Sequence, residues 1–170
     1  MTALHIRPAA PADTPLVLRL LDDAVAWLTA QGRTGQWGTE PWSTDPRAVD
    51  IVERYLTTGQ PWIAELDGEP VGTVTLTDGP GPYLKPATEP ERYVHLLVTA
   101  RHHAGHGIGS ALLTHAAEET RRAGVSLLRV DCYAGDDGKL VTYYERHGFT
   151  RTESFVGTDD WPGQVLARRV

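Results

Sequence analysis

The feature that most constrains the fold is a glycine-rich segment between an apolar run and a helical pattern. The stretch LLVTARHHAGHGIGSALLTHAAEE, residues 96–119, contains Gly105, Gly107 and Gly109 within five positions. Glycine has no Cβ, so its backbone adopts positive φ and can come close to a ligand. A helix N-terminus offers unpaired N–H groups and a partial positive charge. The segment therefore predicts an anion, most often a phosphate, held by main-chain amides where a helix begins.

The patterns on either side predict one mixed α/β domain over residues 1–170. Thr14-Pro15 and Asp45-Pro46 are typical of helix starts, with a capping side chain before a proline. Asp67-Gly68 suits a tight hairpin turn between two strands. The expected order is strand, two helices, three strands, helix, strand, helix, two strands. The expected strands include 4–7, 93–98, 127–133, 150–155 and 165–170, and the expected helices run over about 14–32, 45–59, 107–124 and 138–148.

Composition and charge exclude several classes of function. The net charge is −6 and no cluster of Lys and Arg forms a stripe, so we expect no nucleic-acid partner. No segment approaches about 18 consecutive apolar residues, so we expect no membrane partner. Cys132 is the single cysteine, which excludes a disulfide within one chain and fits a reducing compartment. The first residues lack the pattern of a signal peptide, and we expect a cytoplasmic location.

Several segments together resemble the GCN5-related N-acetyltransferase (GNAT) superfamily. They are HAGHGIGSALL, the preceding strand YVHLLV, the downstream YYERHGF and the opening HIRPAAPAD. The resemblance covers nearly the whole chain and is strongest over residues 93–149. It implies an α/β fold with a mixed, mostly antiparallel sheet of six to seven strands and about four helices. Two central parallel strands splay apart in that fold and leave a cleft for acetyl-CoA, the implied cosubstrate.

The resemblance also implies how the cosubstrate is held. The family's phosphate-loop consensus is Gln/Arg-x-x-Gly-x-Gly/Ala, which Gly107 and Gly109 match, whereas Ala104 stands where Gln or Arg is expected. Main-chain N–H groups would still bind the pyrophosphate. The backbone at Leu97 and Thr99 is implied to pair with the pantetheine amides. The cofactor-binding residues expected on this basis are Leu97, Val98, Thr99, Ala104, Gly105, His106, Gly107, Ile108, Gly109 and Ser110.

Two residues are the expected catalytic groups. Tyr144 matches the family tyrosine of Tyr-Glu-x-x-Gly-Phe, and a phenol with a pKa near ~10 can protonate the departing thiolate. The alternative for Tyr144 is a buried aromatic with a satisfied hydroxyl. His95, two residues before Leu97, has a pKa near ~6.5 that suits a general base for the amine. A structural histidine is the alternative for His95, and Glu40, Asp78 and a water chain are rival bases.

The acceptor is expected to be a primary amine of a small molecule. Trp37, Glu40 and Tyr83 lie in loops and would suit a cationic amine, with aromatic rings beside one carboxylate. The alternative is that the tryptophans anchor a loop to the core. His102, His103 and His106 are not accompanied by a cysteine or carboxylate pattern, so we expect no metal site. A homodimer is an expectation from the family alone.

Two other functions remain open from the sequence. GHGIGS nearly matches the dinucleotide fingerprint Gly-x-Gly-x-x-Gly, and Asp131 ends the next strand where a ribose-binding acid would lie. Ser110 in place of the third glycine, and the six residues TARHHA before the loop, oppose an NAD(P)-dependent oxidoreductase. The other alternative is a sensor domain that binds acetyl-CoA without catalysis. Thiol release from acetyl-CoA in the presence of amines would distinguish these three functions.

Overall fold

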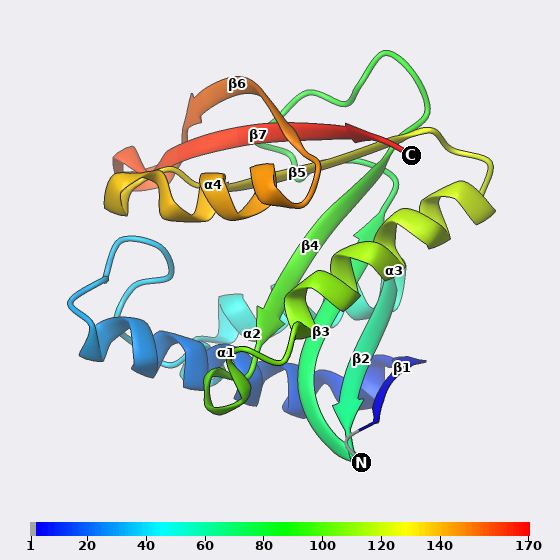
Figure 1. The fold of residues 1–170 in the computed structure, drawn as a ribbon. Coiled ribbons are helices and arrows are strands. Elements are labelled where there is room, and N and C mark those ends of the chain that lie inside the picture. The colour runs from blue at the N-terminus through cyan, green and yellow to red at the C-terminus, as the bar shows by residue number, and fades with distance from the viewer. Residues whose placement is uncertain (1–2) are drawn as a thin grey trace.

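The computed structural model describes residues 3–170, and it shows one seven-stranded sheet with four α-helices (Figure 1). The order of the elements and the α/β fold class predicted from the sequence are both confirmed. The elements are β1 (Leu4–Pro8), α1 (Thr14–Ala30), α2 (Pro46–Thr58), β2 (Gln60–Leu66), β3 (Glu69–Thr77), β4 (Arg92–Thr99), α3 (Ile108–Arg122), β5 (Leu127–Tyr133), α4 (Lys139–Arg146), β6 (Thr150–Val156) and β7 (Pro162–Arg169).

The sheet is antiparallel except at its centre. Its strand order is β1-β2-β3-β4-β5-β7-β6, and only β4 and β5 run parallel. These two strands pair over Arg92–Val94 and Leu128–Val130, and then diverge (Figure 1). On its other side β4 stays paired with β3 as far as Thr99. The edge of β4 that faces β5 is therefore unpaired from His95 onward, as expected for the splayed strands of the predicted fold.

A bulge interrupts β4 at the point where the strands separate. The register between β3 and β4 shifts between Thr73 and Thr75. Leu96 has a φ of 52°, a left-handed conformation that non-glycine residues seldom adopt. Such a bulge bends a strand and changes the direction of its side chains and amides. Leu96 and Leu97 are both partly exposed, although they lie in a central strand.

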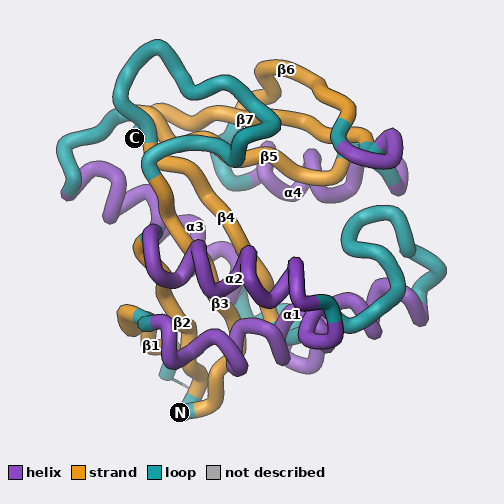
Figure 2. Tube along the Cα trace, turned by 180° about the vertical axis from the view of Figure 1, so that it is seen from behind, coloured by secondary structure: helices purple, strands orange, loops and turns teal. Residues whose placement is uncertain are grey.

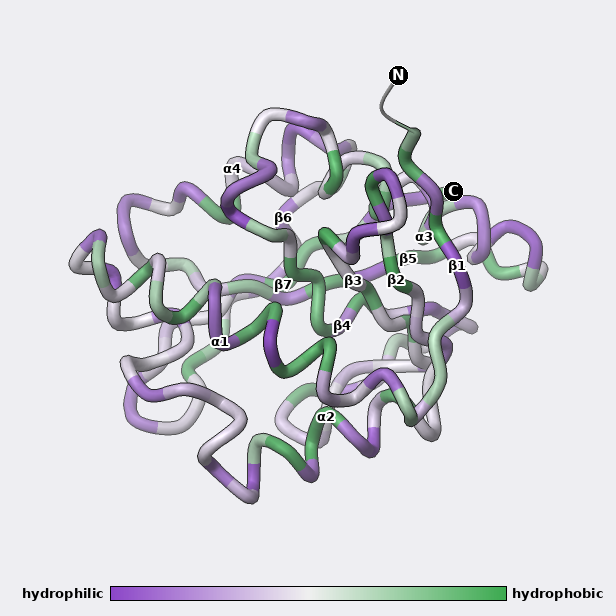
Figure 3. Tube along the Cα trace, turned by 90° about the horizontal axis from the view of Figure 1, so that it is seen from below, coloured by the Kyte–Doolittle hydropathy of each residue, from purple (hydrophilic) through white to green (hydrophobic). Residues whose placement is uncertain are grey.

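The helices cover both faces of the sheet. Figures 1 and 2 show α3 and α4 on one face and α1 and α2 on the other. Apolar side chains on the inner faces of α1 and α3 pack against β3 and β4, among them Val17, Leu21, Leu112, Val74 and Val98. Figure 3 shows hydrophobic residues gathered where the strands cross the middle of the molecule and hydrophilic ones in the outer loops. One continuous core thus supports both sides of the diverging strands.

The local signals at chain turns are largely confirmed. Asp67 and Gly68 both have positive φ, 52° and 82°, and join β2 to β3 as predicted. Asp45 caps α2 by accepting a hydrogen bond from the Arg47 amide at 3.0 Å. The prediction for Thr14 is wrong: it already lies in α1, and its hydroxyl donates to the carbonyl of Pro11 instead of capping the helix.

The last strand begins earlier than predicted, at Pro162 rather than Val165. Gly163 and Gln164 pair with Tyr133 and Cys132 of β5, so the ladder continues beyond the apolar run that the sequence shows. Within residues 3–170, none of the helices is both long and apolar enough to cross a bilayer.

Candidate active site

Two cavities meet where β4 parts from β5. The first has a volume of about 320 Å³ and the second about 210 Å³. Leu97, after the bulge in β4, and Tyr144, on α4, line both of them, so the two cavities form one cleft. The other residues common to both are Gln36, Trp37, Tyr133 and Leu140. This cleft, lined by aromatic, apolar and a few charged side chains, is the candidate active site.

The first cavity is rich in positive charge. Arg33, Arg101 and Lys139 line it, against a single carboxylate, Asp136. The Arg101 guanidinium lies 3.8 Å from the centre of the Trp27 ring, which holds that cation beside the cavity. Leu97, Val98 and Thr99, all predicted to bind the cofactor, form its wall from β4. An anionic ligand with an apolar segment would fit this lining.

The glycine loop presents free main-chain donors at the start of α3. Gly105 and Gly107 have φ values of 89° and 68°, which side chains disfavour. Among residues 3–170, no main-chain acceptor is found for the amides of Gly105 and residues 107–110. The amides of Ala104 and His106 donate instead to carbonyls within the loop, at 3.1 and 3.4 Å. The predicted anion site therefore keeps its glycine and helix donors, while those of Ala104 and His106 are already engaged.

The loop and α4 are in contact through Tyr143. A Cβ at Gly109 would collide with the Tyr143 hydroxyl, so a larger residue at this position would displace the Tyr143 side chain. Tyr143 also lines the first cavity. Tyr143 thus connects the glycine loop to the wall of the first cavity.

Tyr144 lies at the junction of the two cavities. It is only 5% exposed, and its ring packs edge-to-face against Phe149. Burial, reinforced by the neighbouring Cys132, raises the pKa of Tyr144 well above its ordinary value. The phenol is therefore protonated at neutral pH. A protonated hydroxyl at this junction can donate a proton or a hydrogen bond into the cleft.

His95 lines the second cavity, on the strand face that it shares with Tyr93 as predicted. Its Nε2 lies 3.2 Å from the carbonyl of Gly79, so Nε2 donates and Nδ1 carries the lone pair in the neutral ring. The ring stacks on Tyr55 with centroids 4.4 Å apart. Burial lowers the pKa of His95, although Gly79 and Asp131 oppose the shift. The imidazole is thus held neutral and able to accept a proton at pH 7.

Among residues 3–170, Asp131 is the one carboxylate that lines the second cavity. Its Oδ2 accepts hydrogen bonds from the hydroxyls of Tyr93 at 2.6 Å and Tyr83 at 3.0 Å. Two positions earlier on β5, Arg129 forms a buried ion pair with Glu91 at 2.6 Å. Sequence reasoning named Asp131 only as a ribose-binding acid of the oxidoreductase alternative. It missed this cluster because Tyr83 and Asp131 are 48 positions apart.

The predicted acceptor residues divide into two groups. Trp37 lines both cavities and Tyr83 lines the second, so the fold brings them to the cleft. Glu40 is exposed and lines neither cavity, and Asp78, the other rival base, pairs with Arg92 at 2.6 Å outside the cavities. Of the bases named from the sequence, His95 alone lines the cleft.

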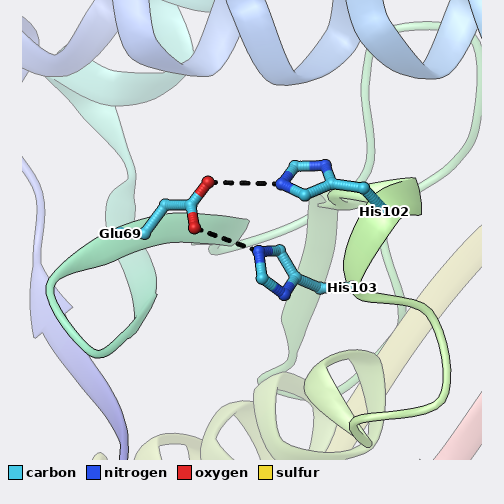
Figure 4. Close-up of side chains that lie close together, drawn as sticks. All are labelled: Glu69, His102 and His103. Atoms are coloured by element: carbon cyan, nitrogen blue, oxygen red, sulfur yellow. Dashed lines mark hydrogen bonds and ion pairs between the residues drawn. The ribbon is translucent and has the colours of Figure 1, made fainter.

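Two of the loop histidines contact a carboxylate, Glu69, that the sequence analysis did not connect with them. The Nε2 atoms of His102 and His103 lie 3.2 and 3.1 Å from the two carboxylate oxygens of Glu69 (Figure 4). Their ligand atoms lie within 4.8 Å of one another. In this arrangement the carboxylate of Glu69 accepts hydrogen bonds from both histidines. The absence of a metal at this cluster stays a prediction. The cluster joins the β2–β3 hairpin to the segment that leads into the glycine loop.

The sequence of the chain matches the model of one protein family. A model of the Acetyltransferase (GNAT) family matches residues 19–149. The chain belongs to this family. GNAT proteins transfer an acetyl group from acetyl-CoA, so the match confirms the resemblance inferred from the glycine loop and from Tyr144.

Individual GNAT relatives are distant. The uncharacterized N-acetyltransferase YesJ of Bacillus subtilis is 26% identical over 163 residues, covering 89% of this chain and 82% of its own. A GNAT acetyltransferase structure from Listeria monocytogenes has a TM-score of 0.73 at 19% identity, covering 98% of this chain and 95% of that one. The ribosomal-protein-alanine N-acetyltransferase of Brucella melitensis has a TM-score of 0.68 at 22% identity, covering 98% and 99%. These likenesses show the GNAT fold and leave the acceptor open.

Proposed function

We propose that this protein transfers an acetyl group from acetyl-CoA directly to the primary amine of a small molecule. The observation that carries the proposal is the junction at Leu97 and Tyr144, where a cationic cavity beside free main-chain donors meets a second, aromatic cavity. The first cavity would take the cosubstrate and the second the acceptor. The acetyl group would then lie at the junction.

The residues of the first cavity fit acetyl-CoA. Free amides at Gly105 and residues 107–110 suit the pyrophosphate; these residues do not line the first cavity, but the loop adjoins its wall at Tyr143. Arg33, Arg101 and Lys139 line the cavity and add positive charge for an anionic nucleotide. The unpaired edge of β4 around Leu97 suits the amides of the pantetheine arm. A yncA structure from Salmonella typhimurium contains its cofactor acetyl-CoA and has a TM-score of 0.64 at 20% identity, covering 98% of this chain and 94% of that one. Acetyl-CoA would supply an acetyl group activated as a thioester.

Protein side chains would manage the protons of the reaction. The amine nitrogen forms a bond to the acetyl carbon as the carbon–sulfur bond breaks. His95, neutral at pH 7, would accept the amine proton at Nδ1, directly or through water. Tyr144 would donate a proton to the departing sulfur. Cys132 does not suit an acyl-enzyme route, because burial and then Asp131 raise the pKa of its thiol to about 12.

The sheet topology excludes one of the two alternative functions and is compatible with the other. A dinucleotide-dependent oxidoreductase would need a doubly wound parallel sheet, whereas only one pair of strands here is parallel. That alternative is wrong. A sensor that binds acetyl-CoA without turnover would present the same first cavity, so the two readings differ only in whether acetyl transfer occurs.

Thiol release on mixing the purified protein, acetyl-CoA and a panel of primary amines tests the proposal. We expect release that depends on both the protein and the amine, with the acetylated amine identified by its mass. Binding of acetyl-CoA, measured by calorimetry, without thiol release from any amine would identify a sensor instead. Absence of binding would overturn the assignment of the first cavity.

A further inference from the structure

The two cavities carry opposite charge. Three cationic side chains and one carboxylate line the first cavity. Of the described residues that line the second cavity, Asp131 is the only carboxylate, and none is a lysine or arginine. A ligand that bears a carboxylate or phosphate would find no counterion in the second cavity. The separation of charge indicates that the two ligands of the cleft differ in sign.

Asp131 has no cationic partner in the part of the chain that the structure describes. The nearest arginine along β5, Arg129, is neutralised by Glu91, with Nε–Oε1 and Nη2–Oε2 distances of 2.6 and 2.9 Å. Both tyrosine hydroxyls that reach Asp131, those of Tyr83 and Tyr93, donate to Oδ2. Within residues 3–170, no donor reaches Oδ1. One oxygen of a partly buried carboxylate is therefore free to accept from a ligand.

Aromatic rings surround this carboxylate. Tyr55, Tyr83 and Trp161 line the second cavity together with Trp37 and Trp42. Aromatic faces attract cations electrostatically, and they pack well against the hydrocarbon part of an organic amine. A wall of this kind with a single negative charge suits a small organic cation.

We infer that Asp131 is the acceptor-binding carboxylate and that the acceptor is a small amine with net positive charge and no acidic group. The inference rests on the transferase activity proposed above, and it names the substrate class. A primary aliphatic amine, with a pKa near ~10, is an ammonium ion at neutral pH. Its N–H groups donate to Oδ1, while the rings enclose its carbon chain. The same cavity contains His95, so the cation binds in the chamber that holds the proposed base.

Matched acceptors test the charge preference without any mutation. 2-Phenylethylamine and phenylalanine differ by one carboxylate next to the amine. We expect kcat/KM for 2-phenylethylamine to exceed that for phenylalanine by at least about tenfold, because the extra carboxylate lies near Asp131 without a counterion. Equal or better use of phenylalanine would overturn the inference.

Asp131→Asn tests the residue itself. Asparagine keeps the size of the side chain and an oxygen that accepts from the tyrosine hydroxyls, but it removes the charge. We expect KM for 2-phenylethylamine to rise roughly ten- to a hundredfold, with KM for acetyl-CoA nearly unchanged. Asp50→Asn is the matched control, because Asp50 is an exposed residue of α2 that pairs with Arg54 and lines neither cavity. An unchanged KM for the amine in Asp131→Asn would refute the assignment.

Calorimetry of 2-phenylethylamine with the unmodified protein separates this inference from the transferase proposal. Amine binding that is lost in Asp131→Asn, without thiol release, would remove the transferase activity and keep the cation site. Thiol release that Asp131→Asn leaves unchanged would keep the activity and remove the cation site. A thermal melt of each variant shows whether it is folded.

Discussion

Tyr144 is the residue whose chemistry is most directly testable. Tyr144→Phe keeps the ring packed against Phe149 and removes only the hydroxyl. We expect kcat to fall by roughly 10²-fold, because the leaving thiolate loses its proton donor, while KM for acetyl-CoA stays nearly the same. Steady-state kinetics over a range of pH checks this. A kcat for Tyr144→Phe that matches the unmodified protein would remove the role.

His95 predicts a particular pH dependence. Burial lowers its pKa, so the neutral base persists below the ordinary value of about 6.5 and is lost only in more acidic solution. We therefore expect the acidic limb of kcat at saturating amine to have its midpoint below pH 6.5, not at the value of a free imidazole. Tyr55, Tyr93 and Asp131 face the ring from α2, β4 and β5, and Tyr83 shares the cavity.

His95→Gln is the companion measurement. It should lower kcat by about 10²-fold or more and abolish the acidic limb of the profile. If the limb persists in His95→Gln, a different group accepts the proton.

Among the elements, the glycine turn before α3 can be compared with a turn elsewhere. Gly107 and Gly68 have φ values of 68° and 82°, and in both cases a Cβ would meet no atom within 4 Å. Alanine at either position should therefore cost a similar free energy of unfolding, about 1 kcal/mol. Only Gly107→Ala should raise KM for acetyl-CoA, because only that turn lies beside the free amides. Equal effects of the two variants on KM would argue against an anion site at the loop.

The loop between β3 and β4 is fastened by a buried ion pair. Arg129 and Glu91 are 8% and 5% exposed, and Arg129 also donates to the carbonyl of Lys85 at 3.1 Å. Glu91→Gln leaves the guanidinium buried without its counter-charge, so we expect the free energy of unfolding in urea to fall by about 3–5 kcal/mol. Glu89, two positions before Glu91, forms an exposed pair with Arg169. Glu89→Gln breaks that pair and should change the free energy of unfolding little.

The sequence predicted the elements better than it predicted their junctions. Gly107 and Tyr144 could be predicted because each lies in a short motif. The turn at Gly107 and the helix around Tyr144 depend mainly on neighbouring residues in the sequence. The bulge at Leu96 carries no local signal, since a leucine with a φ of 52° is imposed by the pairing of β3 with β4. The contacts of Asp131 with Tyr83, and of His102 with Glu69, join distant positions of the chain, so only the assembled sheet reveals them.

At the scale of the whole molecule, the charge of the cleft differs from that of the protein. The chain has a net charge of −6, yet the first cavity is cationic. We expect KM for acetyl-CoA to rise severalfold between about 50 and 500 mM NaCl, since salt screens the attraction of the cavity for an anion. Lys139→Gln should raise KM at low salt and weaken its salt dependence. Lys85, the only other lysine of the sequence, lines neither cavity. Lys85→Gln should therefore change neither the KM for acetyl-CoA nor its salt dependence.

The unpaired oxygen of Asp131 has a consequence for the end of the catalytic cycle. An acetylated amine is a neutral amide, so the reaction removes the positive charge through which the second cavity would bind the acceptor. The product would then bind more weakly than the substrate at the same site, and it would dissociate without a conformational change of the protein. Such an enzyme would keep working while its own product accumulates.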